Sequence, residues 1–431
     1  MAKFFRKKAI FKFKPFSTKQ QKILTWWTKN SPMKDMDGII ADGAIRSGKT
    51  LSMSLSYVIW AMSNFNDQSF GMCGKTIGSL RRNVIQLLKT MLSARGYDVQ
   101  DRRADNLIIV TKGDVSNYFY LFGGKDEASQ DLIQGITLAG CFFDEVVLMP
   151  ESFVNQATGR CSVDGSKFWF NDNPEGPYHW FKTGWIDKAQ EKNLLYLHFT
   201  MEDNLSLSER IRKRYASMYQ GVFYDRYIKG LWCIAEGLIY SMFDPKVHVI
   251  DKRDIPKNDI IAYNISVDYG IFNPTVFLLW GKLRNGNHVL LKEYYHCGRE
   301  TTQKTDSEYA KDLLKFMEGY KVREVIIDPS AASFITEVRK KLRNKATVRK
   351  ARNEVLGGIR LVSSLISQDI LYVDINCHNT IKEFGSYRWD ENASRHGDDK
   401  PLKEEDHTMD ALRYYCMTKI PNYEVRENYT R

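Results

Sequence analysis

The sequence predicts an α/β protein with two domains, and three observations support this prediction. A glycine-rich loop, Gly43 to Thr50, precedes a helical pattern. A long apolar run ends in the acids Asp144 and Glu145, and two later apolar runs each end in one acid, Asp268 and Asp328. Apolar runs of this length are typical of strands buried on both faces of a parallel sheet. Acids at the ends of such strands lie where ligands bind.

The length and charge of the chain limit its possible partners. A chain of 431 residues has room for two or three domains, each with its own core. The 63 Lys and Arg residues outnumber the 52 Asp and Glu residues, and the net charge of +11 suits a polyanion. Nucleic acid is the first expectation for that partner, and a membrane surface is the second.

The cysteines and the apolar runs limit the cellular compartment in which the protein could act. The 7 cysteines are scattered without metal-binding spacing, which favours reduced thiols in a cytosol. No apolar run approaches the roughly 20 residues that span a bilayer, so no membrane partner is expected. Residues 1–16 alternate basic and aromatic side chains. They form either a basic arm that touches DNA or a partner, or a solvated tail without a role.

The loop Gly43 to Thr50 has the form G-x-x-x-x-G-K-T, which binds phosphate. Gly43 and Gly48 allow several backbone N–H groups to point at one anion. Lys49 supplies a charge to the β- and γ-phosphates, and Thr50 offers its hydroxyl to Mg²⁺. The predicted cofactor is therefore ATP with Mg²⁺. The alternative is a glycine-rich turn before an ordinary helix.

The apolar run 138–143 before Asp144 and Glu145 is typical of a Walker B strand. Asp144 would hold Mg²⁺, mostly through water, and Glu145 would polarise the attacking water. The pattern alone is common, but it follows a full phosphate loop. Together the two motifs predict a P-loop ATPase domain of the RecA/ASCE type over residues 1–235.

Other elements complete this first domain. The strand 167–171 would lie beside the Walker strands and could sense the γ-phosphate; the alternative is a strand before an Asn-Pro turn. A helix over 16–30 carries Gln20, Trp26 and Trp27, which would either hold an adenine base or pack. Further elements are predicted as helices at 51–65, 80–92 and 208–220 and as strands at 107–110, 118–122 and 194–200, and residues 71–74 form a short apolar segment before a polar turn.

Glycines, prolines and charges mark a boundary between the domains. The stretch 221–249 is a junction, and residues 236–259 are predicted as a linker. The second domain is predicted over residues 260–431. Its expected strands are 260–268, 275–280, 288–295, 324–327 and 370–373, and its expected helices are 307–318, 331–342, 380–387 and one at the motif 405–414.

Acids of the second domain form a candidate metal site. Asp268 and Asp328 end strands, and the last helix carries Asp406, His407 and Asp410, with Asp406 and Asp410 one turn apart. Clustered acids repel one another unless cations lie between them, and hard oxygen ligands suit Mg²⁺ or Mn²⁺. Two such ions about 4 Å apart cleave phosphodiesters. The order of elements predicts an RNase H-like nuclease domain, although each Asp alone could be a cap or turn residue.

The chain resembles the large subunit of a tailed double-stranded DNA bacteriophage terminase over nearly its full length. The motifs that carry the resemblance are Gly43 to Thr50, Phe142 to Glu145, Asn171-Asp-Asn-Pro174, Gly230-Leu-Trp232, Val267-Asp-Tyr-Gly270, Ile327-Asp-Pro-Ser330 and Asp406-His-Thr-Met-Asp-Ala-Leu-Arg-Tyr414.

The resemblance implies a role for each site residue. Lys49, Thr50, Asp144 and Glu145 would form the ATPase site, and Arg46 stands where the family has a loop arginine that acts on the phosphates. The nuclease metals would be held by Asp268, Asp328 and Asp410, with His407 nearby as a ligand, an orienting group or a surface residue. The Asn171 region would couple hydrolysis to movement, although Phe170-Asn171 stands where many members have Ser or Thr.

The resemblance also implies partners and a place of action. The protein would form a homo-oligomeric ring on the portal protein of an empty prohead, would pull double-stranded DNA in and would cut concatemers. Whether it is a monomer in solution stays open. A small terminase subunit would recognise the packaging site. The expected location is the cytoplasm of the infected bacterium, and the mature virion would lack the protein.

Three other functions compete with this one. A nucleic-acid-dependent ATPase or helicase without nuclease activity would need a second RecA-like domain with an arginine motif, and Gln156 to Arg160 matches that motif only in part. A nucleotide-switched scaffold would have little need for Glu145. The third alternative is a packaging motor whose nuclease is degenerate.

Overall fold

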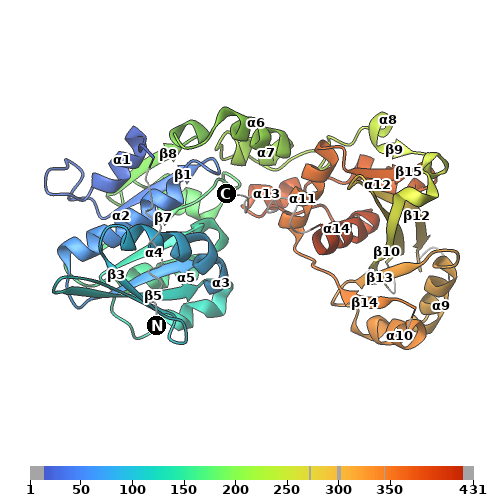
Figure 1. The fold of residues 1–431 in the computed structure, drawn as a ribbon, viewed down its shortest axis with the longest axis horizontal. Coiled ribbons are helices and arrows are strands. Elements are labelled where there is room, and N and C mark those ends of the chain that lie inside the picture. Colours follow the sequence, from blue (N-terminus) through green and yellow to red (C-terminus); the bar gives the residue numbers. More distant parts are fainter. Residues whose placement is uncertain (1–13, 271–272, 299–301, 344, 421–431) are drawn as a thin grey trace, which may run out of the picture. The chain divides into compact units, whose positions relative to one another are not determined.

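Two separate β-sheets organise the chain in the computed structural model, which describes residues 14–270, 273–298, 302–343 and 345–420 (Figure 1). Each sheet is the centre of one unit. The first unit contains the residues up to Arg214 together with Tyr224–Ile234, and the second contains Tyr215–Phe223 and the residues from Ala235 onward. Most of the predicted basic arm, residues 1–13 of 1–16, lies outside the described residues.

The first sheet has eight strands in the order β3-β4-β5-β2-β6-β7-β1-β8. The strands from β5 to β8 in this order run parallel, and β3 and β4 add an antiparallel edge. Their bounds are β1 (Gly38–Gly43), β2 (Ser69–Gly74), β3 (Asp98–Arg102), β4 (Leu107–Lys112), β5 (Val115–Gly123), β6 (Gly140–Asp144), β7 (Lys167–Asn171) and β8 (Leu194–Phe199).

Strand β7 lies between β6 and β1, so the prediction that 167–171 neighbours both Walker strands is confirmed. Asp144 pairs in register with Asn171, and Asn171 pairs with Ala41 of β1. Because parallel strands end at one edge of a sheet, the polar residues that follow β1, β6 and β7 meet there.

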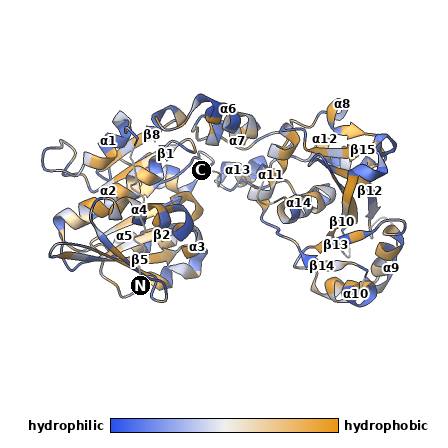
Figure 2. Ribbon diagram, viewed as in Figure 1, coloured by the Kyte–Doolittle hydropathy of each residue, from blue (hydrophilic) through white to orange (hydrophobic). Residues whose placement is uncertain are grey.

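Helices cover both faces of this sheet. The aromatic core under α2 includes Trp26, Tyr57, Trp60 and Trp169, and Figure 2 shows α2 as strongly apolar. The helical segments are α1 (Thr18–Thr25), α2 (Lys49–Asn64), α3 (Ile77–Leu80), the π-helix η1 (Arg81–Ile85), α4 (Gln86–Ser93), η2 (Glu127–Ile133), η3 (Val146–Leu148), α5 (Glu151–Gly159), the π-helix η4 (Lys182–Ile186), η5 (Met201–Asp203), α6 (Glu209–Met218) and α7 (Gly221–Tyr227).

Several features of the first unit differ from the sequence prediction, among them helix α5, which was not predicted. The single helix expected over 80–92 is interrupted by η1, in which Gln86 N–H bonds to Arg81 C=O five residues back. Strand β3 was not predicted, because its sequence is polar and a solvent-facing edge strand needs few apolar residues. The helix expected over 16–30 is shorter: Ser17 caps α1, and the helix ends at Thr25.

The second sheet has seven strands in the order β14-β13-β10-β11-β12-β15-β9. The three strands β10, β11 and β12 form an antiparallel meander, and β13 and β15 pair in parallel with its two edges. Their bounds are β9 (Val249–Ile250), β10 (Ile260–Asp268), β11 (Thr275–Leu283), β12 (His288–His296), β13 (Val322–Ile327), β14 (Thr347–Lys350) and β15 (Leu371–Asp374).

Helix α14 (His407–Lys419) packs on this sheet, where Tyr415 stacks on Trp280 with ring centroids 4.4 Å apart. The other helical segments are α8 (Pro245–His248), η6 (Lys252–Asp254), η7 (Lys257–Asp259), α9 (Asp306–Phe316), α10 (Ala332–Leu342), α11 (Val355–Ser367), α12 (His378–Ser386) and α13 (Glu391–Arg395). Within the described ranges, none of the helices combines the length and apolar character that a bilayer crossing requires.

The stretch 236–259, predicted as a linker, contributes structure to the second unit. Its strand β9 pairs in parallel with β15, where Val249 is opposite Val373. Three short helical segments, α8, η6 and η7, surround this strand. Strand β14 and helices α11 and α13 were not predicted.

Candidate functional sites

The loop between β1 and α2 needs glycine at two positions. Gly43 has φ 122°, and a Cβ there would lie 2.0 Å from the carbonyl oxygen of Phe199. Gly48 has φ 86°, and a Cβ there would lie 2.2 Å from Nε2 of the buried Gln20. Both positions combine a left-handed backbone with close contact, so a side chain would displace the loop.

Lys49 lies beneath this loop and is only 4% exposed. Its ammonium donates to the carbonyl oxygens of Gly43 (2.9 Å) and Ala44 (2.7 Å), to Ser47 Oγ (3.2 Å) and to Asn173 Oδ1 (3.2 Å). Burial lowers the pKa of Lys49 to about 8, although surrounding carboxylates, first that of Asp172, act in the opposite direction. The site therefore holds a buried cation whose partners are mostly neutral oxygens, and an anion that entered would be a stronger partner.

Asn171 joins the two halves of the predicted magnesium site. Its Nδ2 lies 2.9 Å from Thr50 Oγ1 and 2.7 Å from Asp144 Oδ1. Burial, and then the charge of Glu145, raise the pKa of Asp144 to about 7, while the bonds from Asn171 and Thr50 act against the rise. Asn171 Oδ1 is buried and has no hydrogen-bond partner in the described part of the chain. A hydroxyl, a carboxylate and an orphaned amide oxygen at one point are the hard donors that Mg²⁺ prefers.

Glu145 and Arg46, the two other predicted catalytic residues, both have left-handed backbones, with φ 57° each. Glu145 is half-buried directly after β6, and Arg46 is exposed in the loop. The carbonyl oxygen of Arg46 accepts a hydrogen bond of 2.6 Å from Asn204 Nδ2. Such strain in residues other than glycine is common at functional sites.

The helix before the loop packs and does not present a base-binding surface. Trp26 is 1% exposed, with its ring centroid 5.1 Å from that of Trp169. Trp27 donates from Nε1 to Ser56 Oγ over 3.1 Å. Of the two sequence alternatives, the structure favours packing.

Two buried acids near Lys49 were missed by the sequence prediction. Asp42 accepts from Trp232 Nε1 (2.8 Å) and contacts His198 Nδ1 (3.0 Å). Asp172 follows β7, and neither of its buried oxygens has a hydrogen-bond partner among the described residues. Burial, and then the nearby charge of Asp42, raise the pKa of Asp172 well above its usual value. Asp172 stands inside the motif 171–174 and Asp42 directly precedes the phosphate loop, so their positions were the available signal.

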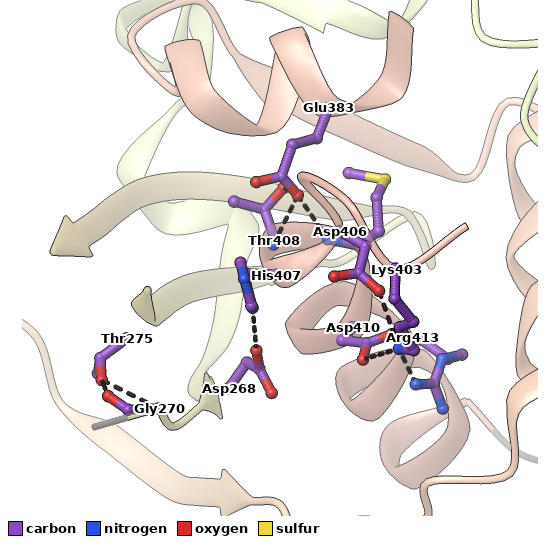
Figure 3. A network of polar contacts seen from close by, with 11 residues as sticks. Asp268, Gly270, Thr275, Glu383, Lys403, Asp406, His407, Thr408, Asp410 and Arg413 are labelled. Atoms are coloured by element: carbon purple, nitrogen blue, oxygen red, sulfur yellow. Dashed lines mark hydrogen bonds and ion pairs between the residues drawn. The ribbon is translucent and has the colours of Figure 1, made fainter. Parts of the chain in front are cut away.

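The second candidate site lies where β10 and β13 end. Val267 and Ile327 pair in register on these neighbouring parallel strands, so the next residues, Asp268 and Asp328, stand side by side at one edge. His407 Nδ1, at the start of α14, lies 3.0 Å from Asp268 Oδ2 (Figure 3). Burial raises the pKa of Asp268 to about 6 and the charge of Asp410 adds to the rise, although the His407 bond opposes it. Burial alone would lower the pKa of His407, but Asp268 raises it above its usual value.

Cations neutralise the acids on α14 (Figure 3). Lys403 Nζ lies 2.8 Å from Asp406 Oδ2 and 3.2 Å from Asp410 Oδ2. The buried Arg413 donates to Asp410 Oδ1 over 2.7 Å. Asp406 is the N-cap residue of α14, and its carbonyl accepts from Asp410 N–H, which confirms their one-turn spacing.

Tyr414 connects the three predicted metal-binding acids. Its phenol hydrogen-bonds to Asp328 and lies within electrostatic reach of Asp268 and Asp410. Burial alone would raise the pKa of Asp328, but donors that include Ser330 N–H (2.7 Å) and Tyr414 hold it below the usual value. The predicted acids therefore gather at one sheet edge.

The acids have the donor chemistry for Mg²⁺ or Mn²⁺, but in this structure they are paired with protein groups. Within the described residues, no group of three or more His, Cys, Asp or Glu side chains is arranged so that it could hold a metal ion. Lys403, Arg413 and His407 instead provide the positive charge. The residues therefore fit a divalent cation by donor type, and their side chains would have to leave these protein partners to bind one.

Lys403 and Glu383 were missed by the sequence prediction. Lys403 belongs to a charged loop that reads as solvated surface, and 62% of its side chain is exposed. Glu383, on α12, accepts from the backbone N–H and the hydroxyl of Thr408 (2.7 Å each) and so fixes the first turn of α14. No local signal in the sequence identifies such a long-range cap.

Comparisons with known proteins cover both units. The family model "Terminase large subunit, T4likevirus-type, N-terminal" matches residues 40–246, and "Terminase RNAseH like domain" matches residues 268–417. The structure is similar to that of the large terminase from a thermophilic bacteriophage, with 59% identity and a TM-score of 0.90 over 94% of this chain and 100% of that chain.

Two further comparisons support the same relationship. The large terminase of the thermophilic bacteriophage in complex with ADP is 58% identical, with a TM-score of 0.87 over 94% of this chain and 100% of that chain. The terminase large subunit of Escherichia phage T5 is 25% identical over 313 residues, which is 68% of each chain.

The buried Asp172 leads to a prediction about stability. In the native state its pKa is raised, so the unfolded chain releases this proton at a lower pH than the folded chain. The contribution of Asp172 to the free energy of unfolding is fully present below the pKa of Asp172 in the unfolded chain. It is lost as the pH rises from that value toward the pKa of Asp172 in the native state. The Asp172→Asn variant cannot ionise, so its unfolding free energy should gain on the wild type by about 1.4 kcal/mol per pH unit over that range.

Thermal melts of both proteins without nucleotide, from about pH 5 to about pH 9, measure this difference. Asp114→Asn is the matched control, because Asp114 is exposed in the turn after β4. Its melting curve should follow that of the wild type at every pH. If the difference between Asp172→Asn and the wild type does not change with pH, Asp172 is ionised in the native state.

Proposed function

Since this chain belongs to the terminase large subunit family, with an N-terminal ATPase domain and a C-terminal RNase H-like nuclease domain, we propose that it uses ATP hydrolysis to move viral double-stranded DNA into a prohead and cuts concatemeric DNA. The observation that carries this proposal is the gathering of Asp268, Asp328 and Asp410 at one sheet edge of a chain that also holds a complete phosphate loop. A helicase would need a second RecA-like domain, and the second unit matches the RNase H-like model instead.

In the ATPase domain, the loop around Gly43 and Gly48 would hold the phosphates through backbone N–H groups. Lys49 would exchange its carbonyl partners for phosphate oxygens, and Thr50 and Asp144 would bind Mg²⁺. Glu145 would orient the attacking water, and Arg46 would stabilise charge on the phosphates. The large terminase of the thermophilic bacteriophage, in complexes with ADP and with ATP-γ-S, supports nucleotide binding by this chain.

Residues at the end of β7 and just after it would report the nucleotide state. Asn171 bonds to both Thr50 and Asp144, and Asn173 bonds to Lys49. A phosphate would compete with Asn173 for Lys49, and Mg²⁺ would compete with Asn171 for Thr50 and Asp144. We therefore assign the coupling of hydrolysis to movement to this segment.

In the nuclease domain, Asp268, Asp328 and Asp410 would hold two divalent cations, Mg²⁺ or Mn²⁺. Such ions activate water and stabilise the leaving oxygen of a phosphodiester. His407 would orient Asp268 through the bond at Nδ1, and Arg413 would fix one oxygen of Asp410. Lys403 would keep the acids neutralised until the cations arrive.

The family also suggests partners. We expect the chain to act as a homo-oligomeric ring on the portal protein, with a small subunit that selects the DNA, in the cytoplasm of the infected bacterium. The net charge of +11 supports DNA as the substrate.

The first test of the ATPase is the Lys49→Ala variant of the full chain. Loss of the ammonium removes charge from the phosphates, so ATP hydrolysis should fall at least about a hundredfold. Metal-dependent cutting of plasmid DNA should remain and so show that the variant is folded. Normal ATP hydrolysis in the variant would refute the assignment of the loop.

The nuclease is tested by Asp268→Ala and Asp410→Ala in the full chain, incubated with supercoiled plasmid and Mn²⁺ or Mg²⁺. Each variant should lose cutting and keep ATP hydrolysis, because the two sites belong to different domains. Asp254→Asn, a change at an exposed acid of the same unit, is the matched control and should cut normally. Cutting by either alanine variant would remove that residue from the site.

Lys403 is tested by metal binding. Lys403→Gln removes the cation that lies between Asp406 and Asp410, so calorimetry should show Mn²⁺ binding at least several-fold more tightly than to the wild type. Lys400→Gln, in the same charged loop, controls for the loss of surface charge, because Lys400 is exposed and pairs with Asp398 instead. Equal affinities in the three proteins would show that Lys403 does not compete with the metal.

A further inference from the structure

A cationic hollow lies on the first unit between strand β3 and the helical segments η1 and α4. Its volume is about 420 Å³. Four of its lining side chains are cations, Arg81, Arg82, Lys89 and Arg103, and one is an acid, Asp101. We call these five residues the Asp101 cluster. Its excess of three positive charges makes an anion the only ligand that its electrostatics favour.

The acid holds the cations in place and does not neutralise them. Asp101 Oδ1 accepts from Arg81 Nη1 over 2.7 Å, and Oδ2 accepts from Lys89 Nζ over 3.0 Å, while Arg103 Nε lies 3.8 Å away. Burial alone would raise the pKa of Asp101, but the donors Arg81 and Lys89 lower it, so the carboxylate is charged at neutral pH. One negative charge thus organises three positive ones.

Some hydrogen-bond donors of the Asp101 cluster remain available to a ligand. Arg81 Nη2 is buried and lacks a hydrogen-bond partner within the described ranges. Arg82 lines the hollow and is exposed, and Arg103 has 81% of its side chain exposed. A buried donor without a partner is costly, and an anion would satisfy it.

The backbone is irregular at this place. Arg81 and Arg82 begin the π-helix η1, and the extra residue of the π turn sets their directions relative to Lys89 on α4. π segments are rare and are frequently found at functional sites. No catalytic residue proposed for the first unit lies on η1, so nucleotide hydrolysis does not explain this feature.

The lining offers little apolar surface to a nucleotide base. It contains no aromatic side chain on which a base could stack, and its only large aliphatic side chain is Ile85. The hollow is also separate from the nucleotide loop, because β3 is the first strand in the sheet order and β1 is the seventh. Guanidinium groups bind phosphate oxygens through paired N–H donors, so a phosphodiester backbone matches the chemistry of the cluster.

We propose that the Asp101 cluster binds the phosphate backbone of double-stranded DNA on the ATPase domain. The inference rests on the proposed function, which supplies DNA as the substrate, and adds the surface that contacts it. Helix α3, which leads into η1, begins shortly after parallel strand β2, at the same sheet edge as the phosphate loop. A rearrangement at that edge on hydrolysis would therefore reach the bound backbone through one short helix.

The test is the full-length double variant Arg82→Gln/Arg103→Gln. Arg81 and Lys89 keep their bonds to Asp101 in this variant, so folding should be unaffected. Fluorescence anisotropy with a labelled duplex of about 30 base pairs, over a series of salt concentrations and with EDTA to prevent cutting, measures affinity. The variant should bind more weakly, and its slope of log K against log salt should be smaller by roughly 2, about 0.9 for each phosphate contact.

Lys29→Gln/Arg102→Gln is the matched control. It removes the same charge, and Arg102 does not line the hollow, since successive β3 side chains alternate between faces and its neighbour Asp101 faces the hollow. The control should keep the wild-type slope. Arg82→Lys/Arg103→Lys should recover most of the slope, because it restores the charges, but not all of the affinity, because the paired donors are missing.

Each outcome decides between the proposals. If the wild type binds DNA and the test and control variants have equal slopes, the proposal that the Asp101 cluster binds DNA is wrong and the proposed function is unaffected. If the wild type neither binds the duplex nor hydrolyses ATP, both proposals fail. A changed oligomeric state in sedimentation with unchanged DNA affinity would assign the hollow to a neighbouring protein chain and would also overturn the proposal.

Discussion

Charge compensation at the ends of parallel strands is the constraint on which both sites depend. In the first unit, Lys49 is the cation among the buried acids Asp42, Asp144 and Asp172. Carbonyl oxygens of the loop replace the water that would solvate the Lys49 ammonium. They hold the ammonium in place, but they carry no full negative charge. The acids respond to burial: Asp172 and Asp144 both have raised pKa values. A site in this state favours anions at the lysine and cations at Asp144, which is the charge pattern of a magnesium nucleotide.

The second unit meets the same constraint with more cations. His407, Lys403 and Arg413 each take an oxygen of an acid at the edge of β10 and β13. Arg413 is buried and also donates to the carbonyl oxygens of Asn353 and Glu354, so it has a structural role that does not depend on metal. Lys403 is exposed, and its departure costs little. The difference in burial separates the permanent partner of Asp410 from the replaceable one.

Much of this arrangement could be predicted from the sequence because it depends on local patterns. Apolar runs that end in Asp144, Asp268 and Asp328 became strands, and the loop glycines stand where the backbone needs them. What the sequence did not predict depends on distant residues. Helix α11 was missed because Gly357 and Gly358 disfavour helices, yet a Cβ on Gly358 would lie 2.4 Å from Arg413 Cγ, so the glycine makes room for that arginine. The π turn at Arg81 is locally indistinguishable from α-helix.

The Asp101 cluster also depends on charge compensation, but with the signs of the charges reversed. In both candidate sites several acids surround a few cations, whereas here one acid is surrounded by three cations. A site with more acids than cations attracts metal ions, and a site with more cations than acids attracts phosphate. In each case the less numerous charged groups reduce the repulsion among the more numerous ones. Removing the less numerous charge would loosen the cluster and not strengthen its binding, because the cations would repel one another. The carboxylate of Asp101 is therefore part of the proposed phosphate site even though it would repel the phosphate.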